Sequence, residues 1–140
     1  TAPLAGFDIV PTVHVVVTDD LDYAYAAVAG YAALYIGGMG SREKNFYNQL
    51  ACRMGFEKEA KLIQDLYLDG KARDAAAAVP REFLDATSLL GPRERIRDRL
   101  AAYQEAGVTT LSVAPYGPSM EHRRAIVHTM AEVAQEAGLG

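Results

Sequence analysis

The chain has 140 residues, half of them apolar, which is enough for one domain with a buried core. Its formal net charge is −4, it has no basic run and no Lys or Arg precedes Arg42, so nucleic-acid binding is not expected. The single cysteine, Cys52, argues against a disulfide framework and favours a reducing, cytoplasmic location. No apolar stretch is long enough to cross a membrane, so no membrane partner is expected.

The first predicted element is a strand over residues 9–18, IVPTVHVVVT. The segment is β-branched and almost continuously apolar, which is typical of a strand buried on both faces of a parallel sheet. Alternation places Val13, Val15 and Val17 on one face, which we expect helices to cover. The opposite, more polar face holds Thr12, His14, Val16 and Thr18.

Residues 19–90 are predicted to form a long helical insertion. Asp19 or Asp20 can cap a helix that runs to about Tyr35 and ends at Gly37-Gly38. Ser41 can cap a second helix, on which Phe46, Leu50 and Met54 share one face. A third helix stops at Gly70, and Pro80 restarts an alanine-rich helical segment.

The C-terminal part predicts a helix over 92–106, a strand over 108–114 and a helix over 119–137. Pro92 opens the first helix, with Ile96, Leu100 and Tyr103 on its inner face, and Ile126, Met130 and Val133 face inward on the last. The chain therefore reads as two βα units of an α/β architecture. Two parallel strands leave backbone groups unpaired, so the missing strands are expected outside these residues or in another copy of the chain.

The stretch LYIGGMGSREKNFYN, residues 34–48, combines glycines with cations in the manner of a phosphate-binding loop. A Walker loop requires lysine directly after the last glycine, where this chain has Ser41. A dinucleotide fingerprint requires a glycine where this chain has Glu43. A helix stop, a tight turn and a capped helix explain the glycines, but they leave a cluster of donors: Arg42, Lys44, Asn45 and Tyr47.

Two stretches resemble a known family. GPRERIRDRLAAYQEAGVTTLSVAPYG, residues 91–117, resembles the last helix-and-strand unit of the luciferase-like flavin and deazaflavin oxidoreductases. Residues 7–56 resemble the preceding strand and helical insertion in the branch that uses the deazaflavin coenzyme F420. The chain departs from the family pattern in lacking a Thr between Gly91 and Pro92, and in carrying Thr109 where the family often has Asp.

The resemblance implies an α/β fold that is the C-terminal portion of a TIM (β/α)8 barrel, namely strands seven and eight with a long helical insertion, predominantly helical as given. It implies hydride transfer between an organic substrate and the deazaflavin. The family's acid–base residues lie on early strands that this chain lacks, so no catalytic residue is assigned and the chain, read as a fragment, is expected to be inactive alone. Two alternatives stay open: an FMN-dependent monooxygenase of the same superfamily, and a non-catalytic module that self-associates.

Candidate site residues follow from the rim of such a barrel, where function lies at the carboxyl ends of the strands. The candidates for binding cofactor or substrate are His14, Thr18, Arg42, Asn45, Tyr47 and Tyr116. Arg42 is the natural partner for a phosphate or carboxylate, because its planar fork binds such anions bidentately. No metal site is expected, since His122 and His128 are six residues apart and Asp19-Asp20 fits a helix cap. A small-molecule substrate and a homo-oligomer are the expected partners.

Overall fold

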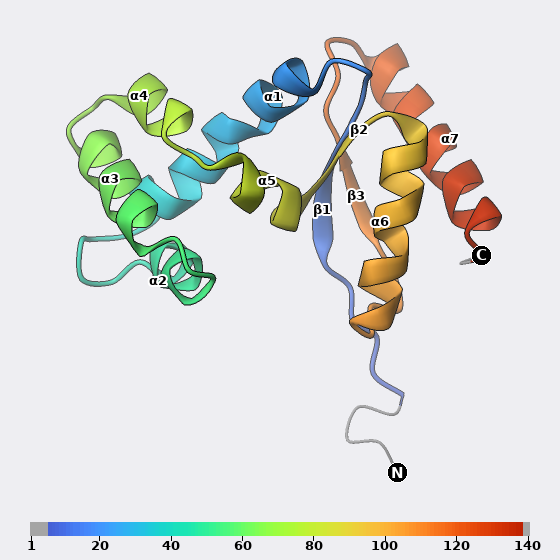
Figure 1. The fold of residues 1–140 in the computed structure, drawn as a ribbon, viewed down its shortest axis with the longest axis horizontal. Helices are drawn as coiled ribbons and strands as arrows, with labels where there is room; N and C mark the ends of the chain where they lie inside the picture. The colour runs from blue at the N-terminus through green and yellow to red at the C-terminus, as the bar shows by residue number, and fades with distance from the viewer. Residues whose placement is uncertain (1–5, 139–140) are drawn as a thin grey trace. The chain divides into compact units, whose positions relative to one another are not determined.

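The computed structural model describes residues 6–138, which belong to two compact units (Figure 1). One comprises Thr1–Leu21 with Ser88–Gly140 and holds the three described β-strands, so we call it the sheet unit. The other comprises Asp22–Thr87 and is helical, so we call it the helical unit.

The sheet unit is built on three parallel strands in the order β2-β1-β3. The central strand β1 (Thr12–Val17) pairs with β2 (Ser88–Gly91) on one side and with β3 (Ser112–Pro115) on the other. His14 lies opposite Ser88 in β2 and opposite Ala114 in β3. The two strands expected from the sequence are therefore parallel neighbours.

The strand β2 is an addition to the predicted elements, because the sequence pattern predicts helix throughout residues 19–90. Helix ends at Thr87, and the next four residues are a fully buried strand. Four residues are too few to show a period, which is why the sequence pattern missed them. The prediction of only two strands in this chain is wrong, and β2 supplies backbone partners on one side of β1 that were expected from outside the chain.

The second expected strand is shorter than predicted and begins at Ser112 rather than at residue 108. The segment that leads into β1 bonds to Thr109 before the strand and to the strand's first residue: the Thr109 amide donates to the carbonyl of Ile9 at 3.1 Å, and the Ser112 amide donates to that of Pro11 at 3.0 Å. These contacts satisfy the backbone without forming a regular ladder.

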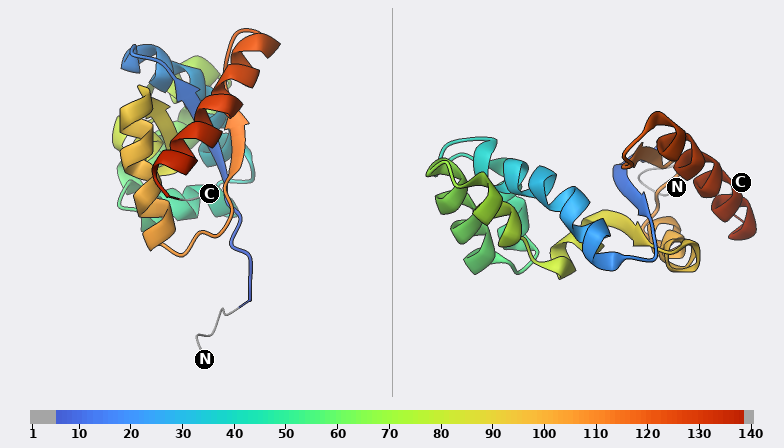
Figure 2. Two further views of the ribbon diagram at one scale, coloured as in Figure 1. Left: turned by 90° about the vertical axis from the view of Figure 1, so that its right-hand side faces the viewer. Right: turned by 90° about the horizontal axis from the view of Figure 1, so that it is seen from above.

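Helices α6 (Arg93–Glu105) and α7 (Met120–Glu136) lie on the same side of the sheet (Figures 1 and 2). Val13 and Val15 of β1 pack there in one buried cluster, with Val17 partly buried against it. The predicted inner residues complete the cluster: Ile96 and Leu100 of α6, and Ile126, Met130 and Val133 of α7. The expectation that helices cover the valine face of β1 is confirmed.

The helical unit consists of six consecutive helical segments: α1 (Leu21–Ala33), η1 (Leu34–Gly38), α2 (Phe46–Arg53), α3 (Glu57–Leu68), α4 (Ala72–Ala77) and α5 (Arg81–Thr87). Helix α3 packs against η1, α2 and α4. The predicted breaks at Gly70 and Pro80 are confirmed, since α3 ends before Gly70 and α5 begins directly after Pro80. Ile63 of α3, Val28 of α1 and Ile36 of η1 are among the fully buried side chains.

Two details around η1 differ from the sequence-based prediction. The first helix does reach Gly38, but its last five residues are a π-helix. Helix α2 begins at Phe46 with Asn45 as its cap, so the prediction that Ser41 caps it is wrong. Ser41 instead closes a tight turn, in which its hydroxyl oxygen accepts from the Lys44 amide at 3.1 Å.

Candidate functional site

Two of the predicted site residues, Thr18 and Tyr116, lie at the carboxyl edge of the sheet, and a third, His14, lies within β1. Thr18 directly follows β1, and its amide donates to the carbonyl of Gly91 at the end of β2, at 3.1 Å. Tyr116 directly follows β3, and its amide donates to the carbonyl of Val15 at 2.8 Å. Parallel pairing places these strand ends side by side, and His14 lies four residues before Thr18 with the same strand parity.

His14 and Tyr116 contact each other through their rings. The ring centroids lie 5.1 Å apart with an interplanar angle of 81°, an edge-to-face arrangement. His14 has the strand parity opposite to Val13 and Val15, which pack against the helices. The imidazole therefore lies on the face of β1 that α6 and α7 do not cover.

Partial burial changes the ionisation of His14. Desolvation disfavours the imidazolium and lowers the pKa of His14 below its ordinary value of 6.5. At neutral pH the ring is therefore uncharged, with one nitrogen able to donate and the other able to accept a hydrogen bond. A neutral imidazole beside a phenol can bind a polar, planar group, but neither side chain carries a positive charge to pair with a phosphate.

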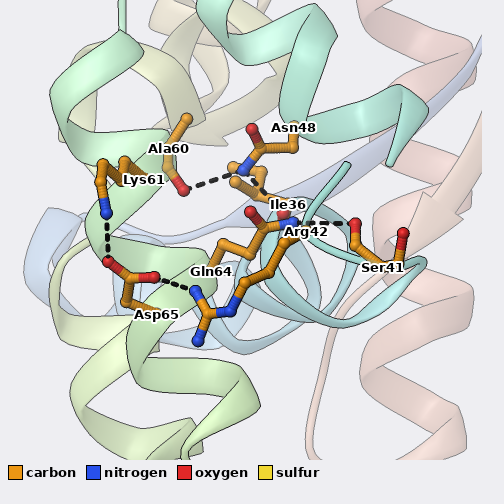
Figure 3. A network of polar contacts seen from close by, with 8 residues as sticks. All are labelled: Ile36, Ser41, Arg42, Asn48, Ala60, Lys61, Gln64 and Asp65. Atoms are coloured by element: carbon orange, nitrogen blue, oxygen red, sulfur yellow. Dashed lines mark hydrogen bonds and ion pairs between the residues drawn. The ribbon is translucent and has the colours of Figure 1, made fainter. Parts of the chain in front are cut away.

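The other three predicted residues lie in the helical unit, where Figure 3 shows the contacts around Arg42. The Arg42 guanidinium forms an ion pair with the carboxylate of Asp65 in α3, and Lys61 donates to the same carboxylate at 2.7 Å. Gln64, nearly fully buried, donates to the carbonyl of Ser41 at 3.3 Å. These bonds hold the loop after η1 against α3, and they occupy the side chain that was expected to bind an anion.

Asn45 is buried and makes three hydrogen bonds within the protein. Its amide nitrogen donates to the carbonyls of Tyr35 at 3.2 Å and Ile36 at 3.0 Å, and its oxygen accepts from the amide of Asn48 at 3.0 Å. Asn48 adds bonds to the carbonyls of Ile36 and Ala60, at 3.1 and 2.9 Å. A helix end leaves carbonyls without intrahelical donors, and these two amides satisfy them at η1.

Close packing explains the glycines at positions 37, 38 and 40. A Cβ on Gly37 would lie 2.5 Å from the Cβ of Tyr67 in α3, and one on Gly38 would meet the Tyr67 ring. A Cβ on Gly40 would collide with the carbonyl of Lys44. The glycines therefore let η1 and its loop approach α3 and close on themselves, and they need no phosphate to account for them.

Tyr47 belongs to a row of aromatic rings on the helical unit. Its ring contacts those of Tyr35, at a centroid separation of 4.6 Å, and Phe46, at 5.4 Å, and Tyr35 stacks on Tyr31 at 4.4 Å. Tyr31, Phe46 and Tyr47 are exposed. The row presents apolar surface rather than a polar pocket.

Comparison with known families identifies the chain. Residues 1–110 match the model of the family described as luciferase-like monooxygenase. The chain belongs to this family.

One curated luciferase-like relative is similar over most of the chain. A Mycobacterium tuberculosis protein (strain ATCC 25618 / H37Rv) named "Putative coenzyme F420-dependent oxidoreductase" is 36% identical over 107 residues, which is 76% of this chain and 31% of that protein. The chain thus spans about a third of the curated relative that it matches. No solved structure gave a significant match.

The described residues of the luciferase-like chain also form a groove in the sheet unit. Between α6, α7 and the segment before β3 lies a groove of about 600 Å³, lined mainly by apolar side chains such as Leu100, Leu111 and Met130, and none of the six predicted site residues lines it. Among residues 6–138, His, Cys, Asp and Glu side chains form no group of three or more suited to a metal ion. In the same residues no helix is both long and apolar enough to span a membrane.

The structure thus brings together His14, Thr18 and Tyr116 in the sheet unit, and Arg42, Asn45 and Tyr47 in the helical unit. Sequence reasoning missed the residues that engage the second group. The spacing of Lys61 and Asp65, four residues apart on one helix face, could have indicated an acidic partner in reach of a basic loop. Nothing in the sequence pattern indicated that Tyr67 lies against the glycines of η1.

Proposed function

We propose that the full-length protein transfers hydride between an organic small-molecule substrate and the deazaflavin coenzyme F420, and that this chain forms its C-terminal part. The observation that carries the proposal is the 36% identity to a protein named for that coenzyme, within a family of luciferase-like enzymes. Because the chain spans 31% of that relative, we propose that it is inactive alone and that the acid–base residues lie elsewhere. A cytoplasmic location belongs to the same proposal.

We propose further that the sheet unit is a segment of a TIM barrel. Two features support this: the parallel pairing of β1 with β3, and the division of β1 into a valine face under helices and a more polar face carrying His14. A barrel strand has these two faces, with helices outside and the functional end at its carboxyl terminus.

His14, Thr18 and Tyr116 on the sheet unit offer groups that suit a flat, polar cofactor ring. His14 offers one donor and one acceptor in its neutral form, Tyr116 offers a hydroxyl and an aromatic edge, and Thr18 offers a second hydroxyl. These side chains would bind and orient the ring, while the bound deazaflavin supplies the carbon that gives or takes hydride. Arg42 stays a candidate for an anionic group only if it leaves Asp65.

The experiment is a titration of the full-length enzyme with coenzyme F420 and, separately, with FMN. We expect saturable quenching of deazaflavin fluorescence, and reduction of the bound deazaflavin by a substrate without consumption of O₂. His14→Ala should weaken deazaflavin binding, whereas His128→Ala, on the exposed side of α7, should not. Absence of deazaflavin binding would refute the proposal.

The second candidate is an FMN-dependent monooxygenase, which the description of the matching family favours. The same titration separates it, because FMN binding together with substrate-dependent O₂ consumption is expected only of the monooxygenase. A non-catalytic module would bind neither cofactor in the full-length protein.

A further inference from the structure

The first and last helices of the helical unit, α1 and α5, bind each other through polar side chains. The hydroxyl of Tyr25 in α1 donates to the carboxylate of Asp85 in α5 at 3.0 Å. The Arg81 guanidinium lies 4.8 Å from the centroid of the Tyr25 ring and forms an ion pair with Asp22. Asp22 and Tyr25 are three residues apart on α1, and Arg81 and Asp85 are four apart on α5, so each pair lies on one face of its helix. We call these four side chains the clasp.

The bond from Tyr25 to Asp85 is the strongest contact of the clasp. It is partly buried and its acceptor is a carboxylate, so it is stronger than a bond between two neutral groups. The side chains of Arg81 and Asp22 are 61% and 79% exposed, and an ion pair this open to water contributes little. The position of Arg81 over the Tyr25 ring adds a cation–π attraction. Tyr25 is therefore the residue on which the clasp depends.

Aromatic packing holds the same helix from a second direction. The ring of Phe83 in α5 meets that of Phe56, the residue before α3, edge to face at a centroid separation of 5.7 Å. Phe83 and the neighbouring Leu84 are buried. The last helix of the unit is thus fixed to the first helix by the clasp and to the start of α3 by an aromatic pair.

The remainder of the helical unit satisfies its own polar groups and has its own buried residues. Asn45 and Asn48 bind carbonyls of η1 and α3, so the helix ends at the centre of the unit need no outside donor. Ile63 of α3 and Val28 of α1 are fully buried. Residues 22–87 are also about as many as the smallest domains that fold alone, roughly 55–65 residues.

The buried cluster of the sheet unit is separate from these residues. All of its members come from β1, β2 and β3 with their flanking residues and from α6 and α7, with Val15 and Leu89 at its centre. Each unit therefore has apolar side chains that pack among themselves, which is the basis of separate cooperativity.

We propose that the helical unit is a separate cooperative unit closed by the clasp, which opens and closes as a whole while the sheet unit keeps its own state. Because the clasp joins the first and last helices, its loss frees both ends of the unit at once and makes the open form more populated. The proposal is independent of the cofactor, since it concerns contacts within residues 22–87. A change in the sheet unit can then take place without loss of the helical fold.

The first test is native-state hydrogen exchange of the 140-residue chain, resolved by residue with NMR. Tyr25→Phe should accelerate the slowest amides of α1 to α5 by about tenfold, and leave those of β1 and α6 unchanged. The matched control is Tyr47→Phe, which removes a hydroxyl from an exposed tyrosine of the same unit and should accelerate neither set. Asp85→Ala combined with Tyr25→Phe should have less than the product of the two single effects, because both remove the same bond.

The second test unfolds the sheet unit on purpose. Val15 and Leu89 are fully buried in its cluster, so Val15→Asp combined with Leu89→Asp places two unpaired carboxylates there and should abolish protection in β1 and α6. The slowest amides of α3 should stay protected in this variant. Loss of protection throughout the chain would overturn the proposal, as would equal acceleration of both units by Tyr25→Phe. An effect of Tyr47→Phe as large as that of Tyr25→Phe would exclude the clasp as the closing contact.

Discussion

The side-chain nitrogen of Asn45 lies 3.0 Å from the carbonyl oxygen of Ile36, nine residues earlier in the chain. With the same side chain Asn45 accepts from the amide of Asn48, so one residue both ends η1 and begins α2. The loop between them is closed by this amide rather than by a ligand.

Asn45→Asp separates the two tasks of this side chain. Aspartate caps a helix as well as asparagine does, so a residue that serves only as a cap would tolerate the change. Here the new carboxylate loses the donor and faces the carbonyls of Tyr35 and Ile36, so we expect the free energy of unfolding to fall by about 1–3 kcal/mol. Urea denaturation followed by circular dichroism measures it, with Ser41→Ala in the exposed turn as a control expected to stay within about 0.5 kcal/mol. An Asn45→Asp variant with the stability of the wild type would mean that Asn45 acts only as the cap of α2.

The approach of Tyr67 to η1 predicts different rescue behaviour for two neighbouring glycines. Gly37→Ala and Gly38→Ala should each destabilise the protein by about 1–3 kcal/mol, because both place a methyl group against Tyr67. Tyr67→Ala should relieve Gly38→Ala, whose obstacle is the ring. It should not relieve Gly37→Ala, whose obstacles are the Tyr67 Cβ and the carbonyl of Ile63.

Gly30→Ala is the matched control for the glycine series. Gly30 lies within α1, and a Cβ there would meet nothing within 4 Å. We expect this variant to be stabilised by about 0.4–1 kcal/mol, since alanine restricts the unfolded chain and favours helix. Double-mutant cycles from thermal or urea unfolding give all the values. Equal rescue of both glycine variants by Tyr67→Ala would contradict the packing of Gly37 against the Tyr67 Cβ.

The ion pair of Arg42 with Asp65 predicts that Arg42 anchors its loop. Arg42→Ala should lower the urea midpoint slightly, and Asp65→Asn should lower it somewhat more because it also removes the partner of Lys61, with the affinity of the full-length enzyme for its cofactor unchanged in both. If Arg42 instead binds an anion, its loss should weaken binding by about ten- to a hundredfold, and Asp65→Asn should tighten it by freeing the guanidinium. Fluorescence titration distinguishes these outcomes.

Low pH should weaken the ion pair between Arg42 and Asp65. The bonds from Lys61 and Arg42 hold the pKa of Asp65 below its ordinary value of 3.8. A depressed carboxyl pKa contributes stability that is complete above 3.8 and is lost as the pH falls through the folded-state value. The difference in urea midpoint between wild type and Asp65→Asn should therefore shrink below that pH.

His14 predicts a pH dependence at higher pH. Burial lowers its pKa below 6.5, so below that pH the unfolded chain binds a proton that the folded protein resists. The free energy of unfolding should fall as the pH drops through 6.5, and the slope should be smaller in His14→Phe, which keeps a ring against Tyr116. Urea titrations at several pH values measure both slopes, while His122 and His128, present in both proteins, cancel in the comparison. Identical slopes would show that His14 is not resisting protonation.

The sequence predicts those elements of the fold that depend on residues close together in the chain. The valine alternation of β1, Pro92 before α6 and Gly70 after α3 each act within a few residues, and each prediction is confirmed. The strand β2 depends instead on pairing with β1 some seventy residues earlier, so its four residues carry no signal of their own. The same holds for Asn45, whose partners in η1 become visible only once the π-helix is formed.

The candidate site residues also separate into those that local sequence geometry could predict and those whose contacts depend on distant residues. Strand parity and the carboxyl-edge rule brought His14, Thr18 and Tyr116 to one region, because both follow from the geometry of a parallel sheet. The donors after Gly40 looked unused because their acceptors, Asp65 and the carbonyls of η1, are supplied by other helices. Their binding role stays a prediction.

The bond from the Thr18 amide to the Gly91 carbonyl extends the pairing of β1 with β2, two neighbouring strands between which the whole helical unit is inserted in the sequence. The segment before Ser88 leaves the sheet at the carboxyl end of β1 and returns at the amino end of β2, so its length and sequence can change as long as it spans the strand pair, while the pairing keeps β1 and β2 in register. Substitution, shortening or replacement of that segment is thus open to evolution and to protein engineering. Relatives can acquire different surfaces on the same strands by exchanging it as one cassette.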